Sequence, residues 1–593
     1  MNLYSKTTFL ILLLSALAAQ AQIGITADKS KHQSFANTPY NVSPIHLPVS
    51  LAGGFAEIRP NHFHSGLDLR TNGKEGERIY APADGYVSRI NISAWGGGKV
   101  LYITHQDGYR TVYMHLSAFC GKIGEFVHNY QYSNHIYAFD VELPKDSIRV
   151  SKGQLVALSG NTGGSSGPHL HYEVRYAKND QTINPLYFGI PYSDPVVPTI
   201  AGIKIYPADP STSINGKNKE LKLYPANKGK SSTGVSDTTV VAGRFYCGIY
   251  TYDQMEVGAR NKNGVDCIEL RVDGELVHRY TVPSFMFEET RIVNALIDYP
   301  QYQRTREYYI LSRHLRGDRN NFNTTFRTQT ADNGYIEFND SKVHKLEYRI
   351  SDHKNNATTH TLFVRSDTTA LLANAKANDG SLTPNGEPIT YYKRFAMQKE
   401  GFCVEIEPYT IYESDLLTYS RIKSEGNITP THRIGLKKHQ LPPHQAFNVT
   451  VDIPAGMNES LIEKLTIVCI NGKSVSALSS TLNKGKLTAP TRSFGGFALC
   501  LDTIAPTIKA VNFANRKAFK GKFLTVKIAD NLTGVVSYSC YINGEWQLAE
   551  HDGKTATLNV SSETLRRGNN RVTFRLEDAV GNTTEETWTI IKN

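Results

Sequence analysis

The chain has 593 residues, of which 40% are hydrophobic and 20% charged, with a formal net charge of +10. This length exceeds what one hydrophobic core supports, so about three to five domains are expected, and the composition excludes a disordered chain. The positive charge favours solubility or a polyanionic partner such as an anionic cell wall. The basic residues form no run or basic helix of the kind that nucleic-acid-binding proteins carry, so no nucleic-acid partner is expected.

Residues 1–21 have the pattern of a secretory signal peptide. Lys6 provides a positive start, Phe9 to Ala19 form a short apolar stretch, and Ala19-Gln20-Ala21 fits a small-x-small cleavage site. This stretch is too short to span a bilayer, and no later segment offers about 18 consecutive apolar residues. We therefore expect an exported protein, located in the periplasm, the cell envelope or outside the cell, with no transmembrane segment in its mature chain.

A compact antiparallel β domain with little helix is predicted for residues 22–192. Short β-branched runs such as Lys99 to Thr104 and Arg110 to His115 alternate there with glycine-rich turns such as Gln106-Asp107-Gly108. Ser193 to Pro198 follow as a linker.

The rest of the chain predicts β-sandwiches in series and hence a mainly β protein. We expect immunoglobulin-like sandwiches over 199–370 and 503–593 and a β-sandwich-like domain over 371–502. The two outer units share a Gly-Val pair, at Gly264 and Gly534, that is followed nine residues later by Asp-Gly-Glu or Asn-Gly-Glu. In the first copy an inserted helix around 284–320 is expected to interrupt the sandwich.

Seven cysteines are too few, and odd in number, for a disulfide framework. None stands in C-x-x-C spacing, so a thiolate zinc site is not supported. Cys247 and Cys267 are the nearest candidates for a disulfide, although the sequence does not fix any pairing.

Four segments of the first domain carry residues suited to metal chemistry. They are His64-Ser65-Gly66-Leu67-Asp68, Tyr113-Met114-His115-Leu116, the glycine loop Gly160 to Pro168, and His169-Leu170-His171-Tyr172-Glu173. Each is weak alone, because with 19 histidines a chance His-x-His pair is about as common as not. Together they offer what a catalytic zinc needs, namely three ligands from histidine and carboxylate with one position left for water. On a strand, His169 and His171 would face the same cleft.

In their order, these segments resemble the M23 (lysostaphin-type, LytM) peptidase family over about residues 50–190. Further matching segments are Phe55 to Arg59, Ala81 to Gly85, His105 to Gly108 and Lys152 to Gln154. The resemblance implies an antiparallel two-sheet domain in which His64, Asp68 and His171 hold one Zn²⁺. His115 and His169 would be catalytic, flanking the bound water and the scissile carbonyl. The implied reaction is hydrolysis of the peptide cross-links of bacterial peptidoglycan.

Two other functions stay open at this point. Some relatives have lost their zinc ligands and act as non-enzymatic regulators of other cell-wall hydrolases, but all five chemical positions are intact here. A peptidase acting on secreted proteins is the other alternative, and the tail domains carry no wall-binding repeat that would decide against it. The sequence says nothing about the oligomeric state.

One departure from the family pattern is an insertion over 120–150, which carries Tyr130, Tyr132, His128 and His135. It follows His115 closely and is expected near the cleft, as a lid or as a surface decoration. Among the other polar residues nearby, His62 is expected to be no ligand and His105 to be structural. Arg59 would contact substrate or brace its loop, and Glu173 would support the metal site or simply belong to its strand.

Overall fold

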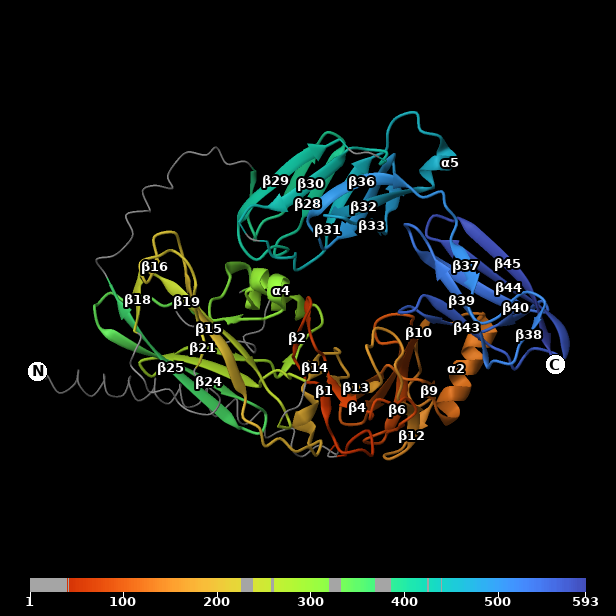
Figure 1. Cartoon of the computed structure of the whole chain (residues 1–593), viewed down its shortest axis with the longest axis horizontal. Coiled ribbons are helices and arrows are strands. Elements are labelled where there is room, and N and C mark those ends of the chain that lie inside the picture. Colours follow the sequence, from red (N-terminus) through yellow and green to blue (C-terminus); the bar gives the residue numbers. More distant parts are fainter. Residues whose placement is uncertain are drawn as a thin grey trace, which may run out of the picture.

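The structure is a computed structural model that describes residues 40, 42–225, 238–257, 261–318, 332–367, 386–423, 426–438 and 440–593. These residues form a mainly β molecule whose units follow one another around a ring, as predicted for the fold class (Figure 1). Within this described part no helix is long and apolar enough to cross a bilayer. The predicted signal peptide, residues 1–21, lies outside it.

The first unit is built on a large antiparallel sheet. Its strands lie in the order β1 (Leu51–Gly53), β4 (Leu67–Arg70), β13 (His169–Tyr176), β8 (Tyr109–Met114), β7 (Lys99–His105), β6 (Gly85–Ile92) and β10 (Phe139–Glu142), with β11 (Arg149–Val150) on β6 and β14 (Thr182–Ile183) on β13. A small second sheet contains, in spatial order, β5 (Arg78–Tyr80), β12 (Leu155–Leu158) and β9 (Ala118–Phe119). The central strand β13 is buried along most of its length, which is typical of a strand covered on both faces.

The insertion folds as helix α2 (Gly121–Asn134) followed by the edge strands β10 and β11. Ile123 and Val127 are buried on one face of α2, and the helix ends at His135, whose φ of 53° places it in the left-handed region. The insertion therefore extends the sheet beyond β6. Its tip contacts the C-terminal unit, where the ring of His135 stacks on that of Trp546 with centroids 5.0 Å apart.

The second unit consists of two sheets. One contains β17 (Leu221–Leu223), β15 (Thr199–Pro207), β19 (Phe245–Tyr252) and β23 (Ile310–Leu311). The other contains β16 (Ser213–Ile214), β18 (Thr239–Ala242), β25 (Ala357–Ser366), β24 (Val343–Ser351), β20 (Cys267–Val272) and β21 (Glu275–Thr281). Cys247 and Cys267 lie in different sheets, and all seven cysteines are free, so the suggested disulfide is wrong.

The expected inserted helix is a series of short elements instead. They are β22 (Ser284–Phe285), η2 (Thr290–Ile292), α3 (Val293–Leu296) and α4 (Tyr299–Thr305). Strand β22 pairs with β14 of the first unit, and Phe285 lies against Phe63 and Phe55 of that unit. One continuous core of buried side chains consequently runs through both units.

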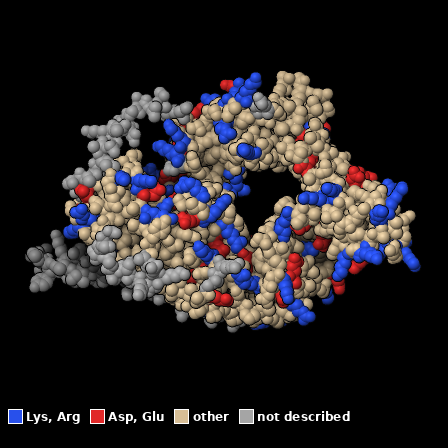
Figure 2. All heavy atoms as spheres, in the orientation of Figure 1, with Lys and Arg blue, Asp and Glu red and all other residues tan. Residues whose placement is uncertain are grey.

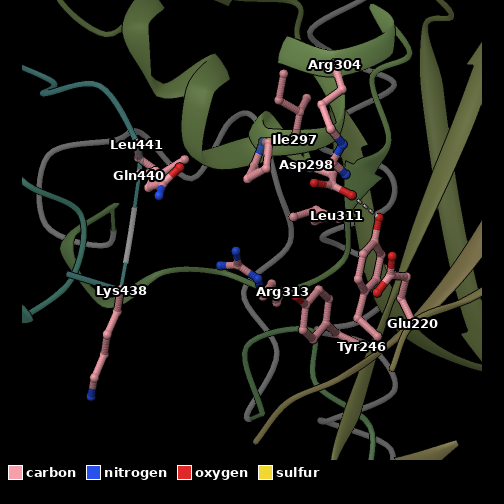
Figure 3. A pocket seen from close by; sticks show the side chains of 12 residues that line it. Glu220, Tyr246, Ile297, Asp298, Arg304, Leu311, Arg313, Lys438, Gln440 and Leu441 are labelled. Carbon is pink, nitrogen blue, oxygen red and sulfur yellow. Dashed lines mark hydrogen bonds between the residues drawn. The ribbon is translucent and has the colours of Figure 1, made fainter. Parts of the chain in front are cut away.

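The third unit also has two sheets. One is β26 (Glu387–Ile389), β29 (Asp415–Ile422), β30 (Thr431–Leu436), β36 (Gly495–Leu501), β32 (Leu465–Asn471) and β33 (Ser474–Leu478). The other is β27 (Phe395–Lys399), β28 (Phe402–Ile406), β31 (Phe447–Asp452), β35 (Lys486–Thr491) and β34 (Thr481–Asn483). A cavity of about 380 Å³ lies between this unit and the second one. Its lining side chains include Lys438 and Leu441 on one side and Tyr246, Asp298 and Arg313 on the other (Figure 3).

The C-terminal unit repeats the topology of the second one. Its sheets are β37 (Thr507–Ala510), β39 (Phe523–Ala529), β43 (Thr557–Ser561) and β42 (Ala549–Asp552), and β38 (Lys517–Ala518), β45 (Thr583–Lys592), β44 (Gly568–Asp578), β40 (Val535–Ile542) and β41 (Glu545–Gln547). In both units a short strand pairs in parallel with the last strand, as β18 with β25 and β38 with β45.

Contacts between the C-terminal and first units close the ring. Lys99 Nζ lies 3.1 Å from Glu550 Oε1, and Lys554 donates a hydrogen bond to the backbone oxygen of Asn161 in the glycine loop. An opening remains in the middle of the ring, and basic side chains are spread over all units of the visible face rather than gathered in one patch (Figure 2).

Candidate active site

Three adjacent strands bring the predicted site residues together. Asp68 on β4 lies directly opposite His171 on β13, and His171 lies opposite Met114 at the end of β8. His115 follows β8 at once, and His64 stands just before β4. The strand register, which fixes the face of every side chain, therefore gathers segments that are about 100 residues apart in the sequence.

One side-chain atom from each of three residues, His64, Asp68 and His171, faces a common position. His64 Nε2 lies 3.0 Å from Asp68 Oδ1 and 2.9 Å from His171 Nδ1, and His171 Nδ1 lies 2.9 Å from Asp68 Oδ1. All three side chains are almost fully buried. The structure thus assembles the residues predicted as metal ligands in one compact group.

The outer hydrogen bonds of the two histidines decide which ring atoms can bind a metal. His64 Nδ1 donates to the backbone oxygen of Gly54 at 2.6 Å, which leaves Nε2 with a lone pair. His171 Nε2 donates to the Glu173 carboxylate at 2.9 Å, which leaves Nδ1 free in the same way. Two nitrogen lone pairs and a carboxylate oxygen that face one another at about 3 Å repel unless a cation or a proton lies between them. This donor set fits a metal ion.

The charges of the site follow from burial and from these contacts. Burial lowers the pKa of His64 to about 4, so its ring is neutral. Burial alone would lower the pKa of His171, but the hydrogen bonds with Asp68 and Glu173 outweigh it and raise it to about 9, so His171 Nδ1 holds a proton that a bound metal ion would replace. Burial would raise the pKa of Asp68, yet the neighbouring His64 and hydrogen bonds from His169 and His171 hold it well below its usual range. Asp68 is therefore ionised and ready to bind a cation.

A second layer of charged residues orients these side chains. Arg59 donates to the outer oxygen of Asp68, Oδ2, at 2.5 Å, so it braces the carboxylate. Glu173 is fully buried between His171 and Arg175, whose Nε lies 2.5 Å from Glu173 Oε2. Burial would raise the pKa of Glu173, but Arg175 and His171 lower it to about 2. Such outer partners fix the ring orientation of a ligand histidine.

The sequence leaves the roles of Arg59 and Glu173 open and does not indicate Gly54 or Arg175 as part of the site. Gly54 acts through its backbone oxygen, which no side-chain pattern reveals. Arg175 follows Glu173 by two residues on β13, and the period of two along a strand is the signal that could have identified it.

His115 and His169 stand beside the ligand group, with ring centroids 4.9 Å apart. His115 Nδ1 donates to Thr162 O at 2.8 Å, and His169 Nδ1 donates to Gly167 O at 2.8 Å. His115 therefore keeps an unprotonated Nε2, whereas His169 Nε2 lies 3.3 Å from Asp68 Oδ1, the acceptor of its hydrogen bond. Burial, reinforced by the charges of His171 and His169, lowers the pKa of His115 to about 3, so that this ring is neutral at ordinary pH.

The glycine loop holds His115 in an unusual backbone conformation. His115 has a φ of 61°, which is uncommon for a residue with a side chain. The Cα of Gly160 packs so closely here that an added Cβ would lie 2.4 Å from Ser117 N and 2.7 Å from His115 O. Glycine at 160 therefore allows the loop to approach the end of β8 and to support the strained residue.

Two other histidines lie outside the ligand group, as expected. His62 is exposed, and its Nδ1 contacts the backbone oxygen of Pro60. His105 is buried, with Nδ1 donating to Asp84 O at 2.9 Å and Nε2 lying 2.8 Å from Thr111 Oγ1. His105 therefore ties together strands of the sheet.

Comparison with known proteins identifies two segments of the chain. The model of peptidase family M23 matches residues 62–133 and 128–185. The model of the Zu5-like domain matches residues 387–502. The third unit, which was expected only as a β-sandwich-like domain over 371–502, is thus Zu5-like rather than immunoglobulin-like.

Several curated proteins are similar to the first unit. An uncharacterized metalloprotease of Haemophilus influenzae is 35% identical over 27% of this chain and 26% of its own length. The DD-carboxypeptidase/endopeptidase Mpg of Neisseria meningitidis is 31% identical over 26% of this chain and 30% of its own. The peptidoglycan DD-endopeptidase ShyA of Vibrio cholerae is 33% identical over 19% of this chain and 20% of its own.

These alignments span less than a third of each relative. The residues matched by the M23 family model include His64, Asp68, His115, His169 and His171. Residues 62–185 of the chain therefore carry a peptidase M23 domain.

Proposed function

We propose that the protein is an exported zinc metalloendopeptidase that hydrolyses the peptide cross-links of bacterial peptidoglycan. The observation that carries the proposal is the convergence of His64 Nε2, Asp68 Oδ1 and His171 Nδ1 within about 3 Å of one another, next to the rings of His115 and His169. Zinc favours such a set of two imidazoles and one carboxylate, which leaves a coordination position open. The names of relatives such as the peptidoglycan DD-endopeptidase ShyA support the substrate.

The mechanism assigns a task to each side chain. His64, Asp68 and His171 would hold one Zn²⁺, which when bound acidifies water and polarises a carbonyl. His115 presents an unprotonated Nε2 because its Nδ1 donates to the backbone oxygen of Thr162, and His169 Nε2 hydrogen-bonds with Asp68. One of them accepts the proton of the attacking water, and the pair then delivers a proton to the leaving amine. The backbone oxygens of Thr162 and Gly167 stabilise the protonated rings.

The test incubates the mature protein, residues 22–593, with purified cross-linked sacculi and reads the muropeptides by mass spectrometry. A fall in cross-linked dimers with a matching rise in monomers, abolished by a chelator and restored by Zn²⁺, supports the proposal. The new ends then identify the bond. His115→Ala serves as the matched control, because it removes a base while keeping the ligand group. An unchanged profile with zinc-loaded protein would refute the assignment of peptidoglycan as substrate, and a secreted protein would be the next substrate to test.

A further inference from the structure

The second and C-terminal units each gather three aspartates at the end that faces the preceding unit. In the second unit they are Asp194, Asp253 and Asp352, and in the C-terminal unit they are Asp502, Asp530 and Asp578. In each group one oxygen of every carboxylate lies within 4.8 Å of the others. Asp194 and Asp502 each stand five residues before the first strand of their unit, β15 or β37. The two groups therefore occupy the same place in a repeated fold.

The hydrogen bonds around the two groups are also duplicated. Asn356 Nδ2 donates to Asp352 Oδ2 at 2.7 Å and to Asp194 O at 2.9 Å. Asn582 Nδ2 donates to Asp578 Oδ2 at 2.7 Å and to Asp502 O at 3.0 Å. In both units the asparagine thus connects, through its two hydrogen bonds, the linker that precedes the unit to the turn that carries the third aspartate.

Two buried oxygens without a hydrogen-bond partner belong to residues that line the cavity at the first group. Asp253 and Asn263 are each only 5% exposed, and their Oδ1 atoms accept no hydrogen bond in the described part of the chain. Asn263, which is not one of the three aspartates, lines the same cavity of about 60 Å³ as Asp194, Asp253 and Asp352. Burying such an oxygen unpaired is unfavourable, so it calls for an occupant of the cavity. In the second group the Oδ1 atom of the half-buried Asp530 also lacks a hydrogen-bond partner in the described part of the chain.

No cation of the described chain neutralises these carboxylates directly. None of the six aspartates has a lysine, arginine or histidine nitrogen within 4.0 Å among the described residues. The nearby Lys354 has its Nζ 4.2 Å from the centroid of the Tyr192 ring, and Lys464 donates to the backbone oxygen of Val580. Burial and the neighbouring Asp194 raise the pKa of Asp253 to about 7, so Asp253 is only partly ionised near neutral pH without a cation. Three carboxyl groups that offer oxygen donors alone match the ligand preference of Ca²⁺ and provide neither the nitrogen nor the sulfur that zinc prefers.

We propose that Asp194, Asp253, Asp352 and Asn263 bind a calcium ion, and that Asp502, Asp530 and Asp578 bind a second one. Each ion stiffens the junction between its unit and the unit before it, because Asp194 and Asp502 belong to the linkers. The first ion also lies behind the active site. Gly54 lines the same cavity, and its backbone oxygen orients His64.

The test measures binding of ⁴⁵Ca²⁺ to the purified full-length mature protein by equilibrium dialysis, up to about 5 mM calcium, since extracellular calcium modules bind at about 10⁻⁴–10⁻³ M. Two calcium ions per chain are expected. Asp253→Asn and Asp530→Asn should each lower the count to one, and the double variant to zero. Glu275→Gln, an exposed acid on a hairpin of the second unit, should leave it at two.

A second measurement keeps the outcome decisive if a substitution disturbs folding. The unfolding temperature of the wild-type protein should rise with calcium and remain nearly constant with the same concentration of magnesium. Zinc is counted separately in each sample, so that failure of the peptidase assignment remains distinguishable. If the wild-type chain binds no calcium, or if both variants still bind two ions, the proposal is overturned, and trapped water or shared protons satisfy the buried oxygens instead.

Discussion

The proposed chemistry depends on which nitrogen atom of each histidine is free. Four histidines of the site donate one ring N–H to an oxygen of the surrounding protein, and the other nitrogen then faces the cleft. The difference between a ligand and a base is therefore one of position. His64 and His171 converge with Asp68, whereas His115 stands beside them with its ring centroid 6.0 Å from that of His171.

This division of roles predicts different consequences for two kinds of alanine substitution. His64→Ala or His171→Ala should lose both bound zinc and activity, because two ligands rarely retain the ion. His115→Ala should keep one zinc per chain and lose activity by about 10²–10⁴-fold, the usual contribution of a general acid or base. Metal analysis and muropeptide release on the same samples test this. A His115→Ala protein without zinc would contradict the assignment of roles.

The supporting residue Glu173 allows a prediction about metal affinity alone. Glu173→Ala removes the acceptor of His171 Nε2 and leaves Arg175 buried without its partner. Zinc affinity should fall by about 10–100-fold, as for other outer partners of ligand histidines. Competition with a chromogenic chelator measures this change. Glu142→Ala, at an exposed position on β10, is the control, and an equal loss of affinity there would argue against a specific role.

At the scale of elements, the register of β4, β13 and β8 builds the site, and the sequence contained only part of that information. The two-residue period of side chains along a strand correctly predicted that His169 and His171 lie near one another. The order and spacing of the motifs matched the pattern of the M23 family. The pairing of Asp68 with His171 could not be derived from either segment alone, because register depends on partners about 100 residues away. The insertion could not be interpreted for the same reason, since its contact, Trp546, lies some 400 residues later.

The glycine loop offers a test of how closely these elements must fit. Gly160→Ala would place a Cβ 2.4 Å from Ser117 N. Removing this clash requires a shift of the backbone segment that includes His115. We expect a loss of about 1–3 kcal/mol in the free energy of unfolding and at least a tenfold fall in activity. Gly167→Ala in the same loop meets no atom within 4 Å and should change neither. Thermal unfolding and activity assays compare the two; equal effects would mean that the close approach at 160 is unimportant.

At the scale of the whole molecule, each unit contacts the next and the last one contacts the first. The second and Zu5-like units meet where Gly317 N donates to Tyr412 O at 2.7 Å, and the Zu5-like and C-terminal units meet at Lys464 and Val580. The C-terminal unit returns to the first one through Trp546, Glu550 and Lys554. Because Lys554 binds the glycine loop at Asn161, the closed ring places the C-terminal unit at the edge of the active site.

The closing contact is small enough for two substitutions to open it. An aromatic pair contributes about 0.5–1.5 kcal/mol and a partly exposed ion pair at most about 1 kcal/mol. Trp546→Ala combined with Glu550→Ala should therefore shift the ratio of closed to open rings about tenfold toward the open form. The radius of gyration from small-angle scattering should increase. Cleavage of sacculi should become faster, because the C-terminal unit no longer restricts a large substrate, while cleavage of a short soluble peptide should not change.

Glu545→Ala is the control, since neighbouring residues on a strand point to opposite faces and Glu545 pairs with Arg566 within its own unit. If the double variant keeps the compact scattering profile, the ring is held by other contacts, and a faster reaction on short peptides would show that the C-terminal unit acts on the catalytic residues rather than on access.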